Sequence, residues 1–127
     1  MTLSLVVPIY EETERFPEFA PRLAAFIDGQ PAGSEIIFVD DGSTDGTATL
    51  ANDFAREHAR VRVLERAHAG KGAAVRAGLL DARADLAAFC DLDLSTPLED
   101  LDALIEAAAA RPILAIASRD LPSSRLV

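Results

Sequence analysis

Apolar runs and amphipathic stretches alternate along the chain. Val, Ile, Leu and Phe fill the apolar runs at odd and even positions alike, which is typical of parallel strands buried on both faces of a sheet. These runs cover residues 3–9, 35–39, 61–64, 86–90 and 113–117. The stretches between them predict helices over residues 17–27, 47–58, 71–82 and 97–110. The final residues, 121–127, predict neither a helix nor a strand.

This alternation predicts an α/β fold, a mainly parallel sheet with helices on both faces. The 127 residues suit one compact domain, and no linker or internal repeat divides them. Sheets of this kind bind ligands beyond the carboxyl ends of their strands. We therefore expect the functional residues in the polar segments that follow the apolar runs, at 10–12, 40–43, 65–71, 91–93 and 118–119.

The composition narrows the possible partners and locations. The formal net charge is -9, with 21 acidic against 12 basic residues, which argues against nucleic acid as a partner. The single cysteine, Cys90, lies in an apolar run, and we expect it in the core rather than in a disulfide. No apolar run reaches the roughly 18 residues of a membrane-spanning helix. The start of the chain lacks the basic region of a signal peptide, so we expect a cytoplasmic protein.

Asp91 and Asp93 are the sharpest chemical signal in the sequence. Residues two apart in an extended segment point the same way, so both carboxylates would face one site. Two carboxylates, completed by diphosphate oxygens and water, suit Mg²⁺ or Mn²⁺. The competing interpretation is a solvated strand end followed by a loop.

Two glycine-containing segments offer further binding groups. Asp40 and Asp41 follow a strand and can accept hydrogen bonds, whereas Asp45 is expected only to cap the next helix; a plain turn is the alternative. Lys71 opens a helix between two glycines, an arrangement that suits an anion, with a structural turn as the alternative. His68 lies next to this candidate site, but the sequence shows no partner for it, so we do not expect it to be a ligand.

Five motifs in order resemble those of the family 2 glycosyltransferases with a GT-A fold. They are V-V-P-I-Y-E-E at 6–12, V-D-D-G-S-T-D-G-T at 39–47, G-K-G-A-A-V-R-A-G at 70–78, D-L-D-L-S-T-P at 91–97 and A-S-R at 117–119. The third and fourth look most like the dolichyl-phosphate β-glucosyltransferase branch and its bacterial relatives. The resemblance covers nearly the whole chain and implies a Rossmann-like nucleotide-diphospho-sugar transferase fold.

The resemblance implies a pocket for the base and ribose of a nucleotide donor. Pro8, Tyr10 and Glu12 match positions that line this pocket in the family. Asp41 matches the acid that pairs with the base, and Asp40 supports it.

The resemblance also implies a catalytic and metal-binding region. Lys71 matches the basic position near the nucleotide. Asp91 and Asp93 match the pair that holds ribose, diphosphate and metal, with Asp93 the direct ligand, and Ser95 adds an oxygen. Arg119 matches an arginine near the acceptor phosphate, so Asp93 and Arg119 are the expected catalytic residues.

The reaction implied by the family is an inverting sugar transfer assisted by Mg²⁺ or Mn²⁺. The expected donor is a nucleoside diphosphate sugar, UDP-glucose ahead of GDP-mannose. The expected acceptor is a polyprenyl or dolichyl phosphate at a membrane surface, with the protein peripheral to the cytoplasmic face. The implied role is cell envelope glycan biosynthesis, and homo-oligomerisation stays open.

The chain departs from the family pattern in two residues and in length. Glu11 stands where the family usually has Asn, and Ala117 where Gly is common. Relatives continue for roughly another half domain, so residues 1–127 are expected to be the donor-binding part, truncated before the acceptor part and weak in transfer. A donor-binding module without turnover is therefore the alternative function. A response-regulator receiver and an aspartate-nucleophile phosphatase fit less well, because the paired acids follow the second apolar run and the D-x-D comes late.

Overall fold

The computed structural model describes residues 1–93, 115–116 and 125–126. The strands are β1 (Leu3–Ile9), β2 (Glu35–Asp40), β3 (Val61–Glu65), β4 (Leu86–Phe89), β5 (Ala115–Ile116) and β6 (Arg125–Leu126). The helices of this part of the chain are α1 (Phe16–Asp28), α2 (Thr47–Glu57) and α3 (Lys71–Leu80). Each predicted element within these residues is confirmed, with bounds that differ by two residues or fewer. The predicted helix over 97–110 lies outside the described residues.

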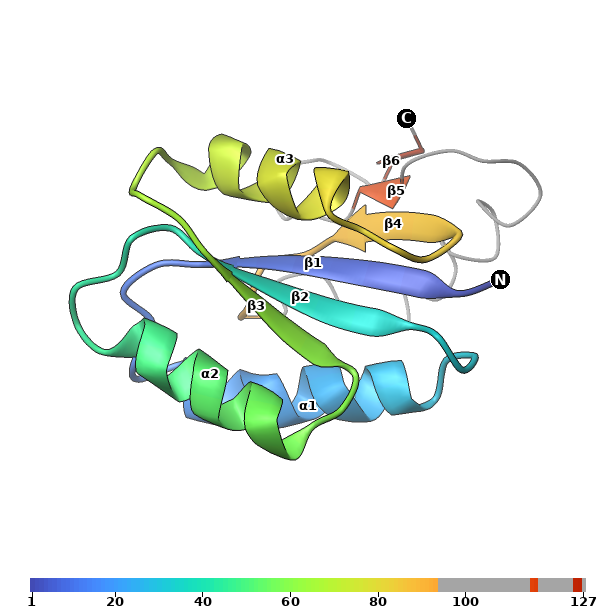
Figure 1. Ribbon diagram of the computed structural model, residues 1–127, viewed down its shortest axis with the longest axis horizontal. Helices are drawn as coiled ribbons and strands as arrows, with labels where there is room; N and C mark the ends of the chain where they lie inside the picture. Colours follow the sequence, from blue (N-terminus) through green and yellow to red (C-terminus); the bar gives the residue numbers. More distant parts are fainter. Residues whose placement is uncertain (94–114, 117–124, 127) are drawn as a thin grey trace.

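The described strands form one sheet in the order β3-β2-β1-β4-β5-β6, with β1 well inside it (Figure 1). Neighbouring strands from β3 to β5 are parallel, so the predicted mainly parallel sheet is confirmed. β6 runs antiparallel to β5. The prediction that residues 121–127 hold no strand is therefore wrong. A strand of two residues is too short to produce a readable pattern of apolar and polar positions.

Helices cover both faces of the sheet, as predicted (Figure 1). α1 and α2 lie on one face, where Leu5, Val7 and Phe38 belong to the larger apolar cluster. α3 lies on the other face, where Val6 and Val39 belong to a second cluster. Because side chains alternate across a strand, consecutive residues of β1 supply the two cores in turn.

β1 and β2 end at the same level in the sheet, which sets the place of the functional site. Ile9 and Asp40, the last residues of these strands, are register partners. The N–H of Asp41 then donates to the carbonyl of Ile9 at 3.0 Å. Tyr10 and Asp41 therefore leave the sheet side by side at its carboxyl edge.

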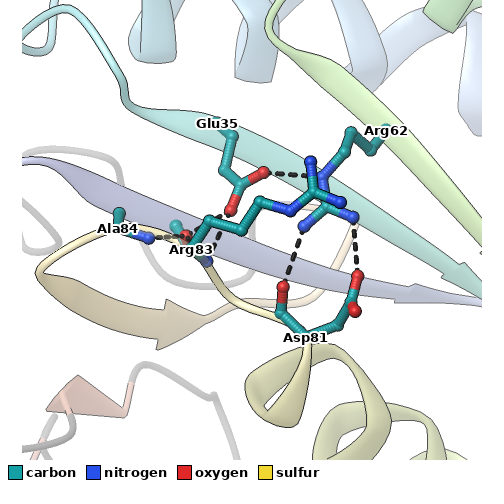
Figure 2. Close-up of polar contacts among 6 residues, drawn as sticks. Glu35, Arg62, Asp81, Arg83 and Ala84 are labelled. Carbon is teal, nitrogen blue, oxygen red and sulfur yellow. Dashed lines mark hydrogen bonds and ion pairs between the residues drawn. The ribbon is translucent and has the colours of Figure 1, made fainter.

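A buried polar network closes the opposite edge, at the amino ends of the strands (Figure 2). Glu35, the first residue of β2, accepts a hydrogen bond from Ser4 of β1 at 2.6 Å. The same carboxylate pairs with Arg62 of β3 at 2.7 Å and accepts the N–H of Arg83 at 3.0 Å. Arg62 also pairs with Asp81, just after α3, at 2.6 Å.

This network keeps a buried carboxylate charged. Burial raises the pKa of Glu35, but the bonds from Arg62, Ser4 and Arg83 outweigh burial, and the pKa ends below its ordinary value. A buried charge is tolerated when it is paired and hydrogen-bonded in this way. The network thus fixes the α3–β4 connection to the first three strands of the chain.

The close packing of α3 on the sheet depends on Gly78. A Cβ at this position would collide with Cγ1 of Val6 and would lie 3.0 Å from Cγ2 of Val39. Glycine normally weakens the interior of a helix. Here the missing side chain lets the helix backbone approach β1 and β2.

We expect Gly78→Ala to destabilise the protein by about 1–3 kcal/mol, because the added methyl overpacks a filled core. Urea denaturation would measure the change in the free energy of unfolding. Gly72→Ala is the matched control: its Cβ would meet nothing within 4 Å, so the helix preference for alanine should leave stability equal or up to about 1 kcal/mol higher. Equal stability of Gly78→Ala and Gly72→Ala would contradict the packing role.

Candidate functional site

A pocket of about 370 Å³ opens at the carboxyl edge of the sheet. It brings together most of the residues that the sequence singled out. Its lining residues are Pro8, Ile9, Tyr10, Glu12, Arg15, Asp41, His68, Gly70, Lys71, Asp91, Leu92 and Asp93. Asp40 is not among the lining residues of this pocket, and Ser95 and Arg119 lie outside the described residues.

The Asp41 carboxylate holds the segment that leads into α3. Its Oδ1 accepts the N–H of Ala69 at 2.8 Å, and its Oδ2 accepts the N–H of Gly70 at 3.0 Å. His68 Nδ1 lies 2.8 Å from Oδ2 and 3.1 Å from the Asp41 carbonyl. Both of these oxygens are acceptors, so Nδ1 must carry the hydrogen. One carboxylate therefore organises three consecutive residues at the pocket wall.

These bonds favour the ionised form of Asp41. Asp41 is only 4% exposed, and burial raises its pKa. The two backbone N–H groups and His68 outweigh burial, and the pKa of Asp41 lies below its ordinary value. A carboxylate offers about four acceptor positions, so these contacts leave limited capacity for a ligand on the pocket side.

Gly42 lets the turn after β2 approach the same segment. Its φ is +75°, and a Cβ there would lie 2.6 Å from the backbone nitrogen of His68. Only glycine fits this conformation and this contact without displacing the backbone. The structure thus explains why a glycine follows Asp40 and Asp41.

Asp40 supports the turn from inside the protein. It is 2% exposed, and its Oδ2 accepts the N–H of Ser43 at 3.1 Å. Its Oδ1 is buried and has no hydrogen-bond partner among the described residues. Asp40 therefore acts on the turn beside Asp41 rather than on the pocket surface.

Asp45 and Glu11 fasten the same turn to the neighbouring segments. Asp45 was expected to cap α2, but the cap position is Gly46. Asp45 Oδ1 instead accepts the N–H of Thr47 at 3.0 Å, so it serves the helix start from one residue earlier. Glu11 Oε1 accepts the N–H of Thr44 at 2.8 Å.

Glu11 adopts a left-handed backbone conformation, with φ of +53°. Asn tolerates this region better than most residues, which is a physical reason for Asn at this place in the family pattern. In this chain the Glu11 side chain compensates through its two bonds to Thr44, from the N–H and from Oγ1 at 2.9 Å.

His68 lines the pocket beside the segment where the sequence placed it, and it has partners that the sequence did not reveal. Its ring stacks on that of Tyr10 with centroids 4.5 Å apart, and its Nδ1 contacts Asp41. The partner that the sequence did not reveal lies 27 residues away, at the end of another strand. No local pattern could have connected the two.

Two cations, Lys71 and Arg15, form three ion pairs within the described residues on the acidic side of the pocket. Lys71, the first residue of α3, forms a close ion pair with Asp91. Arg15, just before α1, contacts Glu12 at 2.6 Å and Asp93 at 3.6 Å. Arg15 was not singled out by sequence reasoning, since an arginine before a helix carries no motif. Asp91 and Asp93, two of the three predicted metal ligands, therefore each have a cation beside them in this structure.

Glu12 is the most constrained acid of this group. Burial raises the pKa of Glu12, Arg15 opposes that shift, and the nearby Asp93 adds to it. Its backbone N–H donates to Thr47 Oγ1 at 2.8 Å, which ties the segment after β1 to α2.

The residues present fit a divalent cation that is completed by a substrate. Among the described residues no three His, Cys, Asp or Glu side chains form a ready metal site. Asp91 and Asp93 supply two hard carboxylates to the pocket lining, although residues 92–93 form a turn rather than the extended segment expected from the sequence. Mg²⁺ and Mn²⁺ accept such a pair when phosphate oxygens and water provide the remaining ligands.

Cys90 is a core residue, as predicted. It is 2% exposed, and burial, with Asp91 and Asp93 nearby, raises its pKa to about 12. The thiol is therefore protonated at neutral pH and takes no part in the pocket chemistry.

The profile described as glycosyl transferase family 2 matches residues 4–125. The chain belongs to this family. Membership confirms the predicted resemblance and replaces the receiver and phosphatase alternatives. The fold is accordingly that of the GT-A glycosyltransferases.

Curated relatives and a solved structure agree with this family. A dolichyl-phosphate beta-glucosyltransferase from Drosophila melanogaster is 39% identical over 82% of this chain and 34% of its own length. A bactoprenol glucosyl transferase from Shigella phage SfV is 36% identical over 94% of this chain and 39% of its own length. The mannosyltransferase PcManGT from Pyrobaculum calidifontis, solved with GDP-Man and Mn²⁺, superposes with a TM-score of 0.71 at 24% identity, covering 84% of this chain and 32% of that chain.

The chain spans about a third of the length of these family members. Within the residues that the structure describes, no helix has both the length and the apolar character that crossing a membrane requires.

We expect Asp41→Asn to destabilise the protein by about 1.5–3 kcal/mol at neutral pH. The amide has one acceptor oxygen and turns a donor toward Ala69 or Gly70, whose N–H groups now face the carboxylate. Urea denaturation at several pH values would measure the loss. Asp28→Asn, the same change at an exposed helix end, should stay within about 0.5 kcal/mol of wild type.

The effect of Asp41→Asn should also depend on pH. The folded pKa of Asp41 is lowered, so its stabilising contribution is complete above the unfolded pKa of about 3.9 and is lost as the pH falls toward the folded value. The stability difference between wild type and Asp41→Asn should therefore shrink below about pH 4. A constant difference from pH 7 to pH 2.5 would contradict the proposed charge state.

Proposed function

We propose that this chain forms the donor-binding part of a glycosyltransferase that moves a sugar from a nucleoside diphosphate sugar to a polyprenyl phosphate. The observation that carries the proposal is one pocket at the carboxyl edge of the sheet, lined by Tyr10, Asp41, Lys71, Asp91 and Asp93. The lipid carriers in the relatives' names, dolichyl phosphate and bactoprenol, support the acceptor class.

The base and ribose of the donor would occupy the side of the pocket formed by β1 and β2. Tyr10 and His68 offer a stacked aromatic face there, and Pro8 and Glu12 lie beside it. Asp41 would accept a base N–H at an acceptor position of its carboxylate that Ala69, Gly70 and His68 do not use. UDP-glucose is the first donor to test, because both relatives' names specify glucosyl transfer, and GDP-mannose is the second.

The diphosphate would lie between the acids and the start of α3. Lys71 stands at the first residue of this helix, where backbone N–H groups and the helix dipole also favour an anion. Asp91 and Asp93 would hold Mg²⁺ or Mn²⁺ against the diphosphate. The bound ion would stabilise the negative charge that develops on the leaving diphosphate. Ser95 as a further ligand stays a prediction outside the described residues.

The transfer needs little acid–base chemistry from the protein. An oxygen of the lipid phosphate attacks the anomeric carbon while the bond from that carbon to the diphosphate oxygen breaks, which inverts the configuration. The attacking phosphate is already anionic near neutral pH, so the residues mainly orient donor and acceptor. Arg119 would face the acceptor phosphate, a role that also lies outside the described residues. A lipid acceptor implies a reaction at a membrane surface, and the cytoplasmic surface is part of this proposal.

Donor binding should depend on Mn²⁺ and on Asp93. In calorimetric titrations with UDP-glucose and GDP-mannose, Mn²⁺ should tighten binding of the preferred donor. Asp93→Ala should remove that gain, because the diphosphate-bound ion loses a carboxylate ligand. Asp53→Ala, which removes an exposed carboxylate from α2, is the matched control and should keep the gain. A full Mn²⁺ effect in Asp93→Ala would refute the metal assignment.

A transfer assay tests the acceptor class. Radiolabelled sugar from the donor that binds best should pass into the organic phase only at a low rate, the weak transfer expected from the sequence, when a short-chain polyprenyl phosphate and Mn²⁺ are present. The matched control is the corresponding polyprenol, which lacks the attacking phosphate and should accept no label. Donor binding with label released only as free sugar would contradict transfer to a lipid phosphate by this chain.

A further inference from the structure

The Arg15 side chain occupies the acidic wall of the pocket where the proposed metal would lie. Its Nη2 is 2.6 Å from Glu12 Oε1, and its Nη1 is 3.6 Å from Asp93 Oδ2. One guanidinium thus spans a buried acid and the expected direct metal ligand. We propose that Arg15 is a positioning residue. Its contact with Asp93 lowers the affinity of the site for a divalent cation alone, so that metal binding depends on the donor. This inference rests on the proposed function.

Arg15 is poorly suited to its position at the amino end of α1. It occupies the position before the helix, where Ser, Thr, Asp or Asn is preferred, and it makes no side-chain capping bond. A cation at a helix amino end also opposes the helix dipole. The local structure therefore gives no reason for an arginine, whereas the contacts with Glu12 and Asp93 do.

The two acids differ in how easily Arg15 can leave them. The Glu12 side chain is 12% exposed and has the shorter contact, so losing its partner would leave a largely buried charge. The Asp93 side chain is 24% exposed and the contact is longer. The side chain of Arg15 itself is 55% exposed. An incoming ligand would therefore break the contact with Asp93 first, while Glu12 retains the guanidinium at the pocket edge.

The charge balance explains the dependence on the donor. Glu12, Asp91 and Asp93 face the two cations Arg15 and Lys71, so the wall already carries only about one net negative charge at neutral pH. A divalent cation alone would reverse that charge and displace Arg15 at the same time. A nucleoside diphosphate sugar brings about two negative charges with the ion, and free UDP about three near neutral pH, which offsets the charge of the ion and gives the displaced guanidinium a phosphate partner.

The test measures the affinity for Mn²⁺ alone and with UDP in wild type and in Arg15→Met. Calorimetry, or the electron paramagnetic resonance signal of free Mn²⁺, gives both affinities without any turnover. Arg15→Met keeps the length of the side chain and removes its charge. We expect Mn²⁺ alone to bind about three- to ten-fold more tightly to the variant, the size of a partly exposed ion pair. The factor by which UDP tightens Mn²⁺ binding should fall.

Two further variants separate this role from general charge effects. Arg22→Met removes an arginine from the same helix, where it pairs only loosely with Glu18 at 3.9 Å, and should bind Mn²⁺ as wild type does. Arg15→Lys keeps the charge and should restore most of the wild-type dependence on UDP. Linkage requires Mn²⁺ to tighten UDP binding by the same factor, which checks each measurement internally.

The outcomes distinguish this inference from the proposed function. In one outcome, wild type and Arg15→Met have the same affinity for Mn²⁺ alone, and UDP tightens Mn²⁺ binding by the same factor in both. This outcome would overturn the role of Arg15 and leave the proposed function intact. Mn²⁺ and UDP that bind independently in wild type would overturn both the role of Arg15 and the metal-assisted part of the proposed function. An equal gain in affinity for Mn²⁺ alone in Arg22→Met would also overturn the inference, because it would reduce the effect to net charge.

Discussion

The Asp41 carboxylate is the contact on which the geometry of the pocket depends. It joins the end of β2 to residues 68–70, and those residues fix where α3 begins. Lys71 is the first residue of α3, so its ammonium reaches Asp91 only if this segment is held. The bonds of this single buried carboxylate thus fix the position of Lys71 relative to the sheet. The close approach of Gly42 to His68 shows how little room this arrangement leaves.

The two edges of the sheet use acidic side chains in opposite ways. At the amino edge, Glu35 is enclosed by Ser4, Arg62 and the N–H of Arg83, and a ligand would have to displace one of these partners (Figure 2). At the carboxyl edge, Asp91 and Asp93 face side chains that are about half exposed, Lys71 and Arg15. The first arrangement fixes the fold. The second can exchange its partners for a ligand without disturbing the core.

The sequence predicted most of the fold and most of the pocket lining, because both follow from local signals. Apolar runs and strand-end motifs place Pro8, Asp41 and Asp93 at one edge of a parallel sheet. The missed features depend on contacts between distant segments: His68 with Asp41, the Glu35 network, and the two-residue β6. The place of Arg15 in the pocket was missed for another reason. Its contact with Asp93 joins residues 78 positions apart, and nothing in its immediate neighbourhood distinguishes it from a solvated arginine.

An anionic protein with the anionic substrates proposed here must rely on local rather than overall charge. The net charge of -9 repels phosphates at long range, but salt at physiological concentration screens that field beyond about 8 Å. Within the pocket the positive contributions are Lys71, Arg15 and the start of α3, all close to the acids that would hold a metal. Under the proposed function, a diphosphate would approach these groups together with a counter-ion for Asp91 and Asp93. The same acids would then disfavour a free anion and favour a diphosphate with its metal.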